Sequence, residues 1–144
     1  MQDKKNPKVF LVDDDALYLK SMEIAFLNHT EFDVVTFISG ELCIRDLAQN
    51  PDAIILDYFL NGIEKDAMNG LETLDRIKAF NPNIPVVMLS SQDKIEVAVN
   101  CMRHRAFDYV VKSETAFTRL QNIISAIFLR KKMEQQLTWY MDRM

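Results

Sequence analysis

The sequence predicts an α/β domain with a doubly wound, five-stranded parallel sheet and helices on both faces. Short β-rich runs alternate with longer segments of helical pattern along the chain. Three of the runs are almost continuously apolar, which is typical of parallel strands buried on both faces. Right-handed crossovers between such strands place helices on both sides of the sheet. With 144 residues, the chain has the length of a single domain.

Five runs have the composition of strands. Their apolar character favours a parallel sheet, since antiparallel strands with one solvent-exposed face would alternate more strictly between apolar and polar residues. The expected strands are residues 8–12, 33–37, 53–56, 84–89 and 107–111. Turn-forming pairs, Asn50-Pro51 and Asn81-Pro82, separate neighbouring elements. The order of the segments therefore indicates consecutive strand–helix units.

Each expected helix follows a residue whose side chain can cap its first turn. Asn69, followed three residues later by Glu72, is a variant of the capping box. The last helix has an apolar face to about Leu129 and can continue through Gln136, because neither Gly nor Pro interrupts it. The expected caps are Asp15 before 16–27, Ser39 before 40–48, Asn69 before the helix that contains Leu71, Leu74 and Ile77, Ser91 before 92–103, and Ser113 at the start of the last helix.

Composition excludes several classes of function. The net charge of −4 and the lack of a basic recognition helix argue against direct nucleic-acid binding by this chain. No apolar run approaches the ~18 residues of a membrane-spanning helix, and the first residues do not resemble a signal peptide. We therefore expect a cytoplasmic protein without membrane contact. Cys43 and Cys101 lack the spacing of metal ligands, so structural thiols are expected.

Polar residues follow four of the five expected strands. The first ends at Asp13 and Asp14, the third at Asp57, the fourth at Ser90 and the fifth at Lys112. In doubly wound sheets, ligands bind at the carboxyl ends of the strands, so these side chains are expected in one crevice. Three carboxylates together need a cation, and Mg²⁺ prefers carboxylate, backbone and phosphate oxygens. Asp57 is then placed to attack phosphorus, while Lys112 and Ser90 bind phosphoryl oxygens.

Each residue also has a purely structural interpretation. The acidic run after the first strand can be a helix cap and first turn, and Asp57 can be an ordinary loop residue. Ser90 and Ser91 can cap a helix, and Lys112 can be a solvated strand end. The occurrence of all these groups at four strand ends, in this order, favours a functional site.

These motifs together resemble the receiver domain of two-component response regulators, over about residues 7–130. VFLVDDD resembles the first strand and acidic pocket, AIILDYFL the third strand, PVVMLSSQ the fourth and FDYVVK the fifth. The resemblance implies a flavodoxin-like receiver fold with strand order 2-1-3-4-5. The roles that it implies are phosphoacceptor for Asp57, direct metal ligand for Asp14, water-mediated ligand for Asp13, backbone-carbonyl ligand for Phe59, switch residues for Ser90 and Tyr109, and phosphoryl-binding amine for Lys112.

The resemblance also implies partners and a mechanism. The phosphoryl donor would be a histidine kinase or a phosphotransfer protein, and the metal Mg²⁺ or Mn²⁺. The phosphoryl group would draw in Ser90, and Tyr109 would rotate into the vacated space, as a population shift. The output would be a changed surface on the fourth helix, fifth strand and fifth helix. For Tyr109 the structural alternative is a half-buried strand aromatic.

Three features depart from the family pattern. The loop between Asp57 and Gly70 is about five residues longer than usual and lacks Pro. Ser113 follows Lys112 in place of the usual proline, so we expect a trans or a strained cis bond there. Arg105 stands where many relatives have Gly, so we expect the end of the fourth helix to differ.

Two other functions stay open at this stage. One is a Mg²⁺-dependent phosphatase or phosphotransferase with an aspartyl intermediate, although Phe59 stands where many such enzymes have a second acid. The other is a pseudo-receiver that only binds a partner. We favour a non-enzymatic regulatory domain at 1–130. Residues 131–144 are expected to form a frayed helical tail, a linker to an absent output domain, or a homodimer contact through Leu137, Trp139 and Met141.

Overall fold

The computed structural model describes residues 6–144 and contains the predicted parallel sheet. The strand order is β2-β1-β3-β4-β5, and every neighbouring pair is parallel. The strands are β1 (Lys8–Val12), β2 (Asp33–Phe37), β3 (Ala53–Asp57), β4 (Val86–Ser90) and β5 (Asp108–Val111). The prediction of a doubly wound α/β fold with order 2-1-3-4-5 is therefore confirmed.

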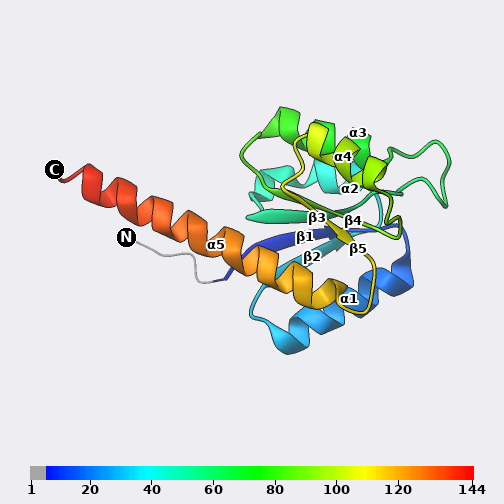
Figure 1. Cartoon of the computed structure of the whole chain (residues 1–144), viewed down its shortest axis with the longest axis horizontal. Coiled ribbons are helices and arrows are strands. Elements are labelled where there is room, and N and C mark those ends of the chain that lie inside the picture. The colour runs from blue at the N-terminus through cyan, green and yellow to red at the C-terminus, as the bar shows by residue number, and fades with distance from the viewer. Residues whose placement is uncertain (1–5) are drawn as a thin grey trace.

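Helices cover both faces of this sheet (Figure 1). Helices α1 and α5 lie on one face, and α2, α3 and α4 lie on the other. The helices are α1 (Ala16–His29), α2 (Gly40–Arg45), α3 (Gly70–Phe80), α4 (Ile95–Arg103) and α5 (Ala116–Met141), with a 3₁₀ turn, η1 (Leu47–Gln49), after α2.

Alternate residues of each central strand supply two separate apolar cores. In β1, Phe10 and Val12 pack with the α2–α4 layer, whereas Val9 and Leu11 pack with α1 and α5. Every residue of β3 and β4 is buried, including the terminal Asp57 and Ser90. Burial on both faces explains the nearly continuous apolar runs, since neither side of these strands meets water.

The strand predictions are correct for β1 and β2 and shifted by one or two residues elsewhere. Strand β4 begins at Val86 rather than at residue 84, because the amide of Ile84 donates to the carbonyl of Asn81 in a turn. Asp57 is itself the last residue of β3 and pairs in register with Leu89. The phosphoacceptor candidate is thus held by the sheet rather than by a loop.

The helix predictions are confirmed in number, but their extents need correction. Helix α1 ends at His29 rather than at residue 27, and α5 begins at Ala116, after Thr115 rather than Ser113. The segment predicted as one helix over 40–48 is α2 followed by η1, which ends at Asn50 in the left-handed conformation (φ 58°). Helix α4 begins at Ile95 and not at residue 92, and Ser91 does not cap it. Helix α5 continues beyond Gln136 to Met141. The predicted caps of Asp15, Ser39 and Asn69 all accept backbone N–H groups, and Asn69 forms a full capping box with Glu72.

The expectation that Arg105 would alter the end of α4 is wrong. Arg105 adopts the left-handed conformation (φ 71°) usual for Gly at this position, at a backbone cost of about 1 kcal/mol. Two hydrogen bonds return to the last turn of the helix, from Arg105 N to the Met102 carbonyl and from Ala106 N to the Cys101 carbonyl. These bonds satisfy carbonyl groups that the helix end would otherwise leave unpaired. The Lys112–Ser113 bond is trans.

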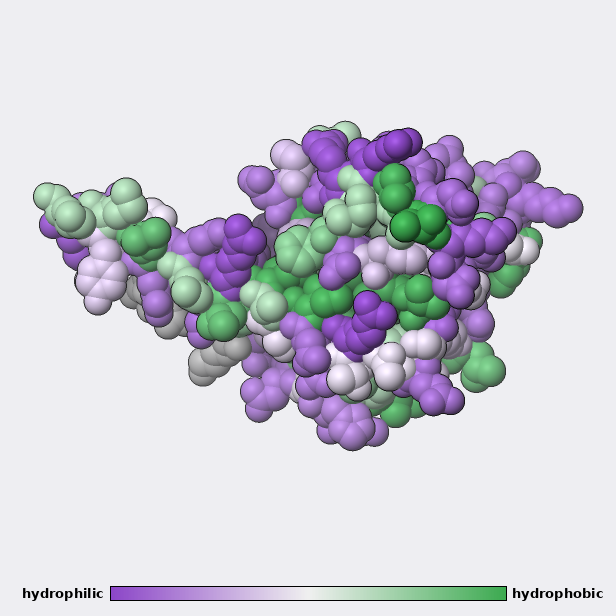
Figure 2. All heavy atoms as spheres, viewed as in Figure 1, coloured by the Kyte–Doolittle hydropathy of each residue, from purple (hydrophilic) through white to green (hydrophobic). Residues whose placement is uncertain are grey.

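The last third of α5 projects beyond the body of the domain (Figure 1). The amine of Lys131 donates to the buried carboxylate of Asp52 at 2.8 Å, which ties the base of the projection to the start of β3. Beyond it, Met133, Leu137 and Tyr140 are exposed, and Figure 2 shows apolar side chains at intervals along this helix. No helix among residues 6–144 is both long enough and apolar enough to cross a membrane.

Candidate functional site

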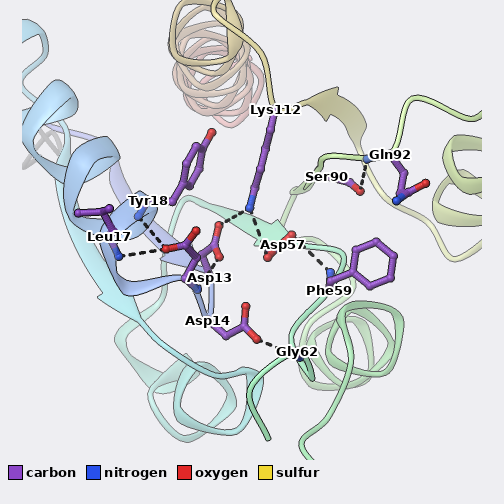
Figure 3. A network of polar contacts seen from close by, with 11 residues as sticks. Asp13, Asp14, Leu17, Tyr18, Asp57, Phe59, Gly62, Ser90, Gln92 and Lys112 are labelled. Carbon is purple, nitrogen blue, oxygen red and sulfur yellow. Dashed lines mark hydrogen bonds and ion pairs between the residues drawn. The ribbon is translucent and has the colours of Figure 1, made fainter. Parts of the chain in front are cut away.

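The three predicted acids meet at the carboxyl edge of the sheet. Asp13 and Asp14 follow β1, and Asp57 ends the adjacent strand β3. One carboxylate oxygen from each acid lies within 4.8 Å of one from each of the others (Figure 3). Asp13 and Asp57 are buried, while Asp14 is partly exposed. The structure therefore brings together the residues that the sequence predicted as a cation-binding cluster.

Lys112, which follows β5, extends into the same crevice (Figure 3). Its Nζ lies 2.9 Å from Oδ2 of Asp13 and 3.5 Å from Oδ2 of Asp57. Burial acts to lower the pKa of Lys112, but pairing with Asp13 and Asp57 outweighs it, so the pKa lies above its ordinary value. The amine is consequently a fixed positive charge at neutral pH, on the side of the crevice where a phosphoryl group on Asp57 would need one.

The environment of Asp57 changes its acidity. Burial and the neighbouring Asp13 carboxylate raise the pKa of the Asp57 carboxyl to about 7, although Lys112 acts in the opposite direction. The Phe59 amide, 3.4 Å from Oδ1 of Asp57, also favours the ionised form. A cation beside these oxygens would lower the pKa again, because it stabilises the charged carboxylate.

The donor set fits a hard divalent cation. It offers carboxylate oxygens from three residues, two of them buried, and Mg²⁺ takes such oxygens together with water and phosphate ligands. Zinc is disfavoured because the cluster contains neither Cys nor His. The backbone of Phe59 lies beside Asp57, as its amide contact shows, which places that residue next to the cluster.

Ser90 and Tyr109 both contact Gln92, in the segment between β4 and α4. The buried Oγ of Ser90 accepts a hydrogen bond from the Gln92 amide at 3.0 Å. The hydroxyl of Tyr109 donates to the Gln92 carbonyl. Burial raises the pKa of the Tyr109 phenol, which stays a neutral donor at physiological pH. The backbone amide and carbonyl of Gln92 thus connect Ser90, at the end of β4, to Tyr109 on β5.

Three neighbours of the acids were not predicted from the sequence. Tyr18 on α1 places its ring 4.4 Å from the Lys112 amine, a cation–π contact. Gly62 donates its amide to Asp14 at 3.1 Å from the long loop after β3. Gly70 lets the start of α3 approach β3, since a Cβ there would lie 2.5 Å from the carbonyl oxygens of Asp57 and Tyr58. The position of Tyr18 could have been inferred from the sequence, because it lies in the first turn of the helix that Asp15 caps. No sequence pattern indicated Gly62.

The model of the response regulator receiver domain family matches residues 9–125 of this chain. The match covers most of the chain and includes every residue of the acidic cluster, Ser90 and Lys112. The chain therefore belongs to the response regulator receiver domain family, and phosphorylation-dependent signalling in two-component systems is its general kind of function.

The curated relatives are longer than the region that this chain matches. The chain is 32% identical over 108 residues to the transcriptional regulatory protein PrrA of Mycobacterium bovis, covering 74% of this chain and 44% of that protein. It is 38% identical over 107 residues to a protein-glutamate methylesterase/protein-glutamine glutaminase of Bacillus licheniformis, covering 71% of this chain and 28% of that protein. The chain thus spans less than half the length of these relatives.

Solved structures agree with the fold. A response regulator receiver domain protein from Clostridium thermocellum aligns with a TM-score of 0.75 at 25% identity, over 88% of this chain and 98% of that one. NtrX from Brucella abortus aligns with a TM-score of 0.79 at 24% identity, over 97% of this chain and 31% of that one. At this level of identity the second likeness concerns the fold alone.

Proposed function

We propose that this domain accepts a phosphoryl group on Asp57 from a histidine kinase or a phosphotransfer protein. The observation that carries the proposal is the convergence of Asp13, Asp14 and Asp57 within 4.8 Å, with the Lys112 amine 3.5 Å from Asp57. Phosphoryl transfer asks a protein mainly for positioning and charge neutralisation, and this crevice supplies both.

The proposed reaction is a displacement at phosphorus. An Asp57 oxygen forms a bond to phosphorus while the P–N bond of the donor phosphohistidine breaks, and its electron pair returns to the imidazole ring. Lys112 neutralises charge on the transferred group, and the Ser90 hydroxyl donates to one of its oxygens. A Mg²⁺ or Mn²⁺ ion, held by Asp57, by Asp14, through water by Asp13, and by the Phe59 carbonyl, would neutralise the remaining charge.

We further propose that the signal leaves through α4, β5 and α5. When the Ser90 hydroxyl turns to the phosphoryl group, it no longer accepts the hydrogen bond from the Gln92 amide. Tyr109, whose hydroxyl donates to the Gln92 carbonyl, then changes position as well. Ile95, Val99 and Met102 leave apolar surface exposed on α4, which suits a partner that binds one state better. Figure 2 shows apolar side chains gathered over α4 and between α4 and α5.

We place the receiver domain at residues 1–130 and a helical extension at 131–144. The output partner is either another protein or a domain outside this chain. The helical extension is suited to link the receiver to such a domain or to contact a second copy of the chain. This is a regulatory domain whose chemistry is its own phosphorylation and dephosphorylation, in the cytoplasm, without membrane or direct nucleic-acid contact. A homodimer in the phosphorylated state is part of the proposal.

Incubation with phosphoramidate and Mg²⁺, followed by intact-mass and peptide mass spectrometry, tests the acceptor role. The wild type is expected to gain one phosphoryl group on Asp57, and Asp57→Asn none. Asp66→Asn is a matched control, because Asp66 is an exposed acid of the loop after β3. Steady turnover of a small phosphate ester would favour a phosphatase instead, and neither label nor turnover would favour a pseudo-receiver.

A further inference from the structure

The carboxylate of Asp14 is held by a backbone group from a distant loop. Its Oδ2 accepts the amide of Gly62 at 3.1 Å, across 48 positions of sequence. Figure 3 shows this oxygen turned to Gly62, while the other oxygen faces the side where Asp13 and Asp57 lie. This hydrogen bond holds the Asp14 carboxylate in one rotation beside two neighbouring carboxylates that repel it.

The loop that carries Gly62, residues 60–69, begins at Leu60, which is buried in the core, and hydrogen bonds of Gly62 and Met68 attach residues 61–68 to the domain at two points. At its far end the Met68 amide donates to Glu41 on α2 at 2.8 Å, next to the capping box of α3. Between these points lies a local turn, in which Ala67 N donates to the Glu64 carbonyl, and the Ile63 side chain is exposed. Of the hydrogen bonds described for residues 61–67, the one that reaches the body of the domain is the bond to Asp14.

We propose that the Gly62 amide is a positioning group for the cation site, and that the 60–69 loop is a lid whose closure is coupled to metal binding. This inference rests on the proposed function, because it takes Asp14 as a ligand. Holding Oδ2 leaves the other oxygen of Asp14 available to the cation in a fixed direction. Coupling between two binding events is reciprocal, so a cation that gains affinity from the closed loop must also stabilise its closure.

Position 62 allows the amide to be removed with a matched control. A Cβ at Gly62 would lie 3.4 Å from Oδ2 of Asp14, an ordinary van der Waals distance, and its φ is not in the left-handed region. Gly62→Ala therefore keeps the N–H donor at little cost. Gly62→Pro removes the donor. Gly62 itself is exposed, so neither substitution touches the core.

Titration of variants of the whole 144-residue chain with Mg²⁺ in a calorimeter is the first test. Gly62→Ala is expected to bind as the wild type does, and Gly62→Pro about 10- to 100-fold more weakly, as for loss of one hydrogen bond to a charged group. Glu41→Ala releases the far end of the loop without touching Asp14, so it is expected to weaken Mg²⁺ binding less than Gly62→Pro does. A loss in Glu41→Ala equal to that in Gly62→Pro would overturn the assignment to the Gly62 amide.

Hydrogen exchange of the loop amides with and without Mg²⁺ is the second test. In the wild type and Gly62→Ala, Mg²⁺ is expected to slow exchange at residues 61–64, and unchanged exchange contradicts the coupling. If the wild type neither binds Mg²⁺ nor accepts a phosphoryl group, the proposed function fails together with this inference. If the wild type does both and Gly62→Pro binds Mg²⁺ equally well, the inference alone is overturned.

Discussion

The Lys112 amine lies 2.9 Å from the fully buried Oδ2 of Asp13. Asp57, on the neighbouring strand, is 3.5 Å from the same amine. One cation therefore balances two buried acids in the metal-free domain. A buried carboxylate without a partner is costly, so the stability of the domain without metal depends on this amine.

Lys112→Met is expected to lower the free energy of unfolding of the metal-free domain by about 3 kcal/mol at pH 8, because it leaves two buried acids without a counter-charge. Mg²⁺ should restore part of the loss, since it supplies positive charge to the same oxygens. Urea unfolding in EDTA and in excess Mg²⁺ measures both. Lys20→Met is the control, because its amine pairs with Glu23 at the surface and contributes little. Equal small losses in both variants contradict the prediction.

The pKa of Asp57, raised to about 7, predicts how stability without metal depends on pH. Between the ordinary range of an aspartate, near 4, and pH 7, the folded state binds more protons at this residue than the unfolded state. Stability therefore falls as pH rises through this window and is not reduced further by Asp57 above it. In EDTA, the wild type should lose stability relative to Asp57→Asn between pH 5 and about pH 7.5.

Thermal unfolding of both proteins across this range checks the sign. With saturating Mg²⁺ the trend should reverse, because the cation favours the ionised carboxylate and binds more tightly as the proton leaves. A wild-type curve parallel to that of Asp57→Asn in EDTA would contradict the raised pKa.

The elements that local patterning encodes were predicted well from the sequence. Strands β1 and β2 have the predicted bounds, and the caps Asp15 and Asn69 are as expected. The residues that predict each of these elements lie within the element or a few positions from it. The acids at strand ends were also predictable, because a parallel sheet brings its carboxyl ends together whatever the intervening sequence.

The features that sequence reasoning missed depend on contacts between distant segments. Helix α4 starts late, at Ile95, and the carbonyl of Gln92 before it accepts a hydrogen bond from Tyr109 on β5, 17 positions along the chain. The Asp14–Gly62 contact joins residues 48 positions apart. A capping rule that reads four consecutive residues contains no information on either contact.

Phe59→Asn is expected to shorten the lifetime of the phosphoryl group several-fold. The Phe59 ring is 44% exposed and packs edge-on against Tyr58 at 4.9 Å, beside Asp57. We expect an apolar ring at this place to keep water from an acyl phosphate on Asp57, whereas an amide would bind water there. Loss of label from phosphorylated protein over time gives the rate. Phe80→Asn, an exposed ring at the end of α3, should decay as the wild type. An unchanged or longer lifetime in Phe59→Asn defeats the idea.

Truncation after Lys132 is expected to leave thermal stability unchanged. The side chains of residues 133–144 are exposed, and the shortened chain keeps the Lys131–Asp52 pair at the base of the projection. Lys131→Met in the full chain should cost up to about 1 kcal/mol, since the amine is 41% exposed and the pair is screened by solvent.

The same truncation tests the exposed stripe of Met133, Leu137 and Tyr140 as a contact between copies of the chain. Light scattering with and without phosphoramidate and Mg²⁺ should show association of the full chain in the phosphorylated state and none in the truncated one. Leu137→Glu in the full chain should match the truncation, because a charge on an exposed helix blocks an apolar contact without altering the fold. Association that survives both changes would place the contact on α4, β5 and the body of α5.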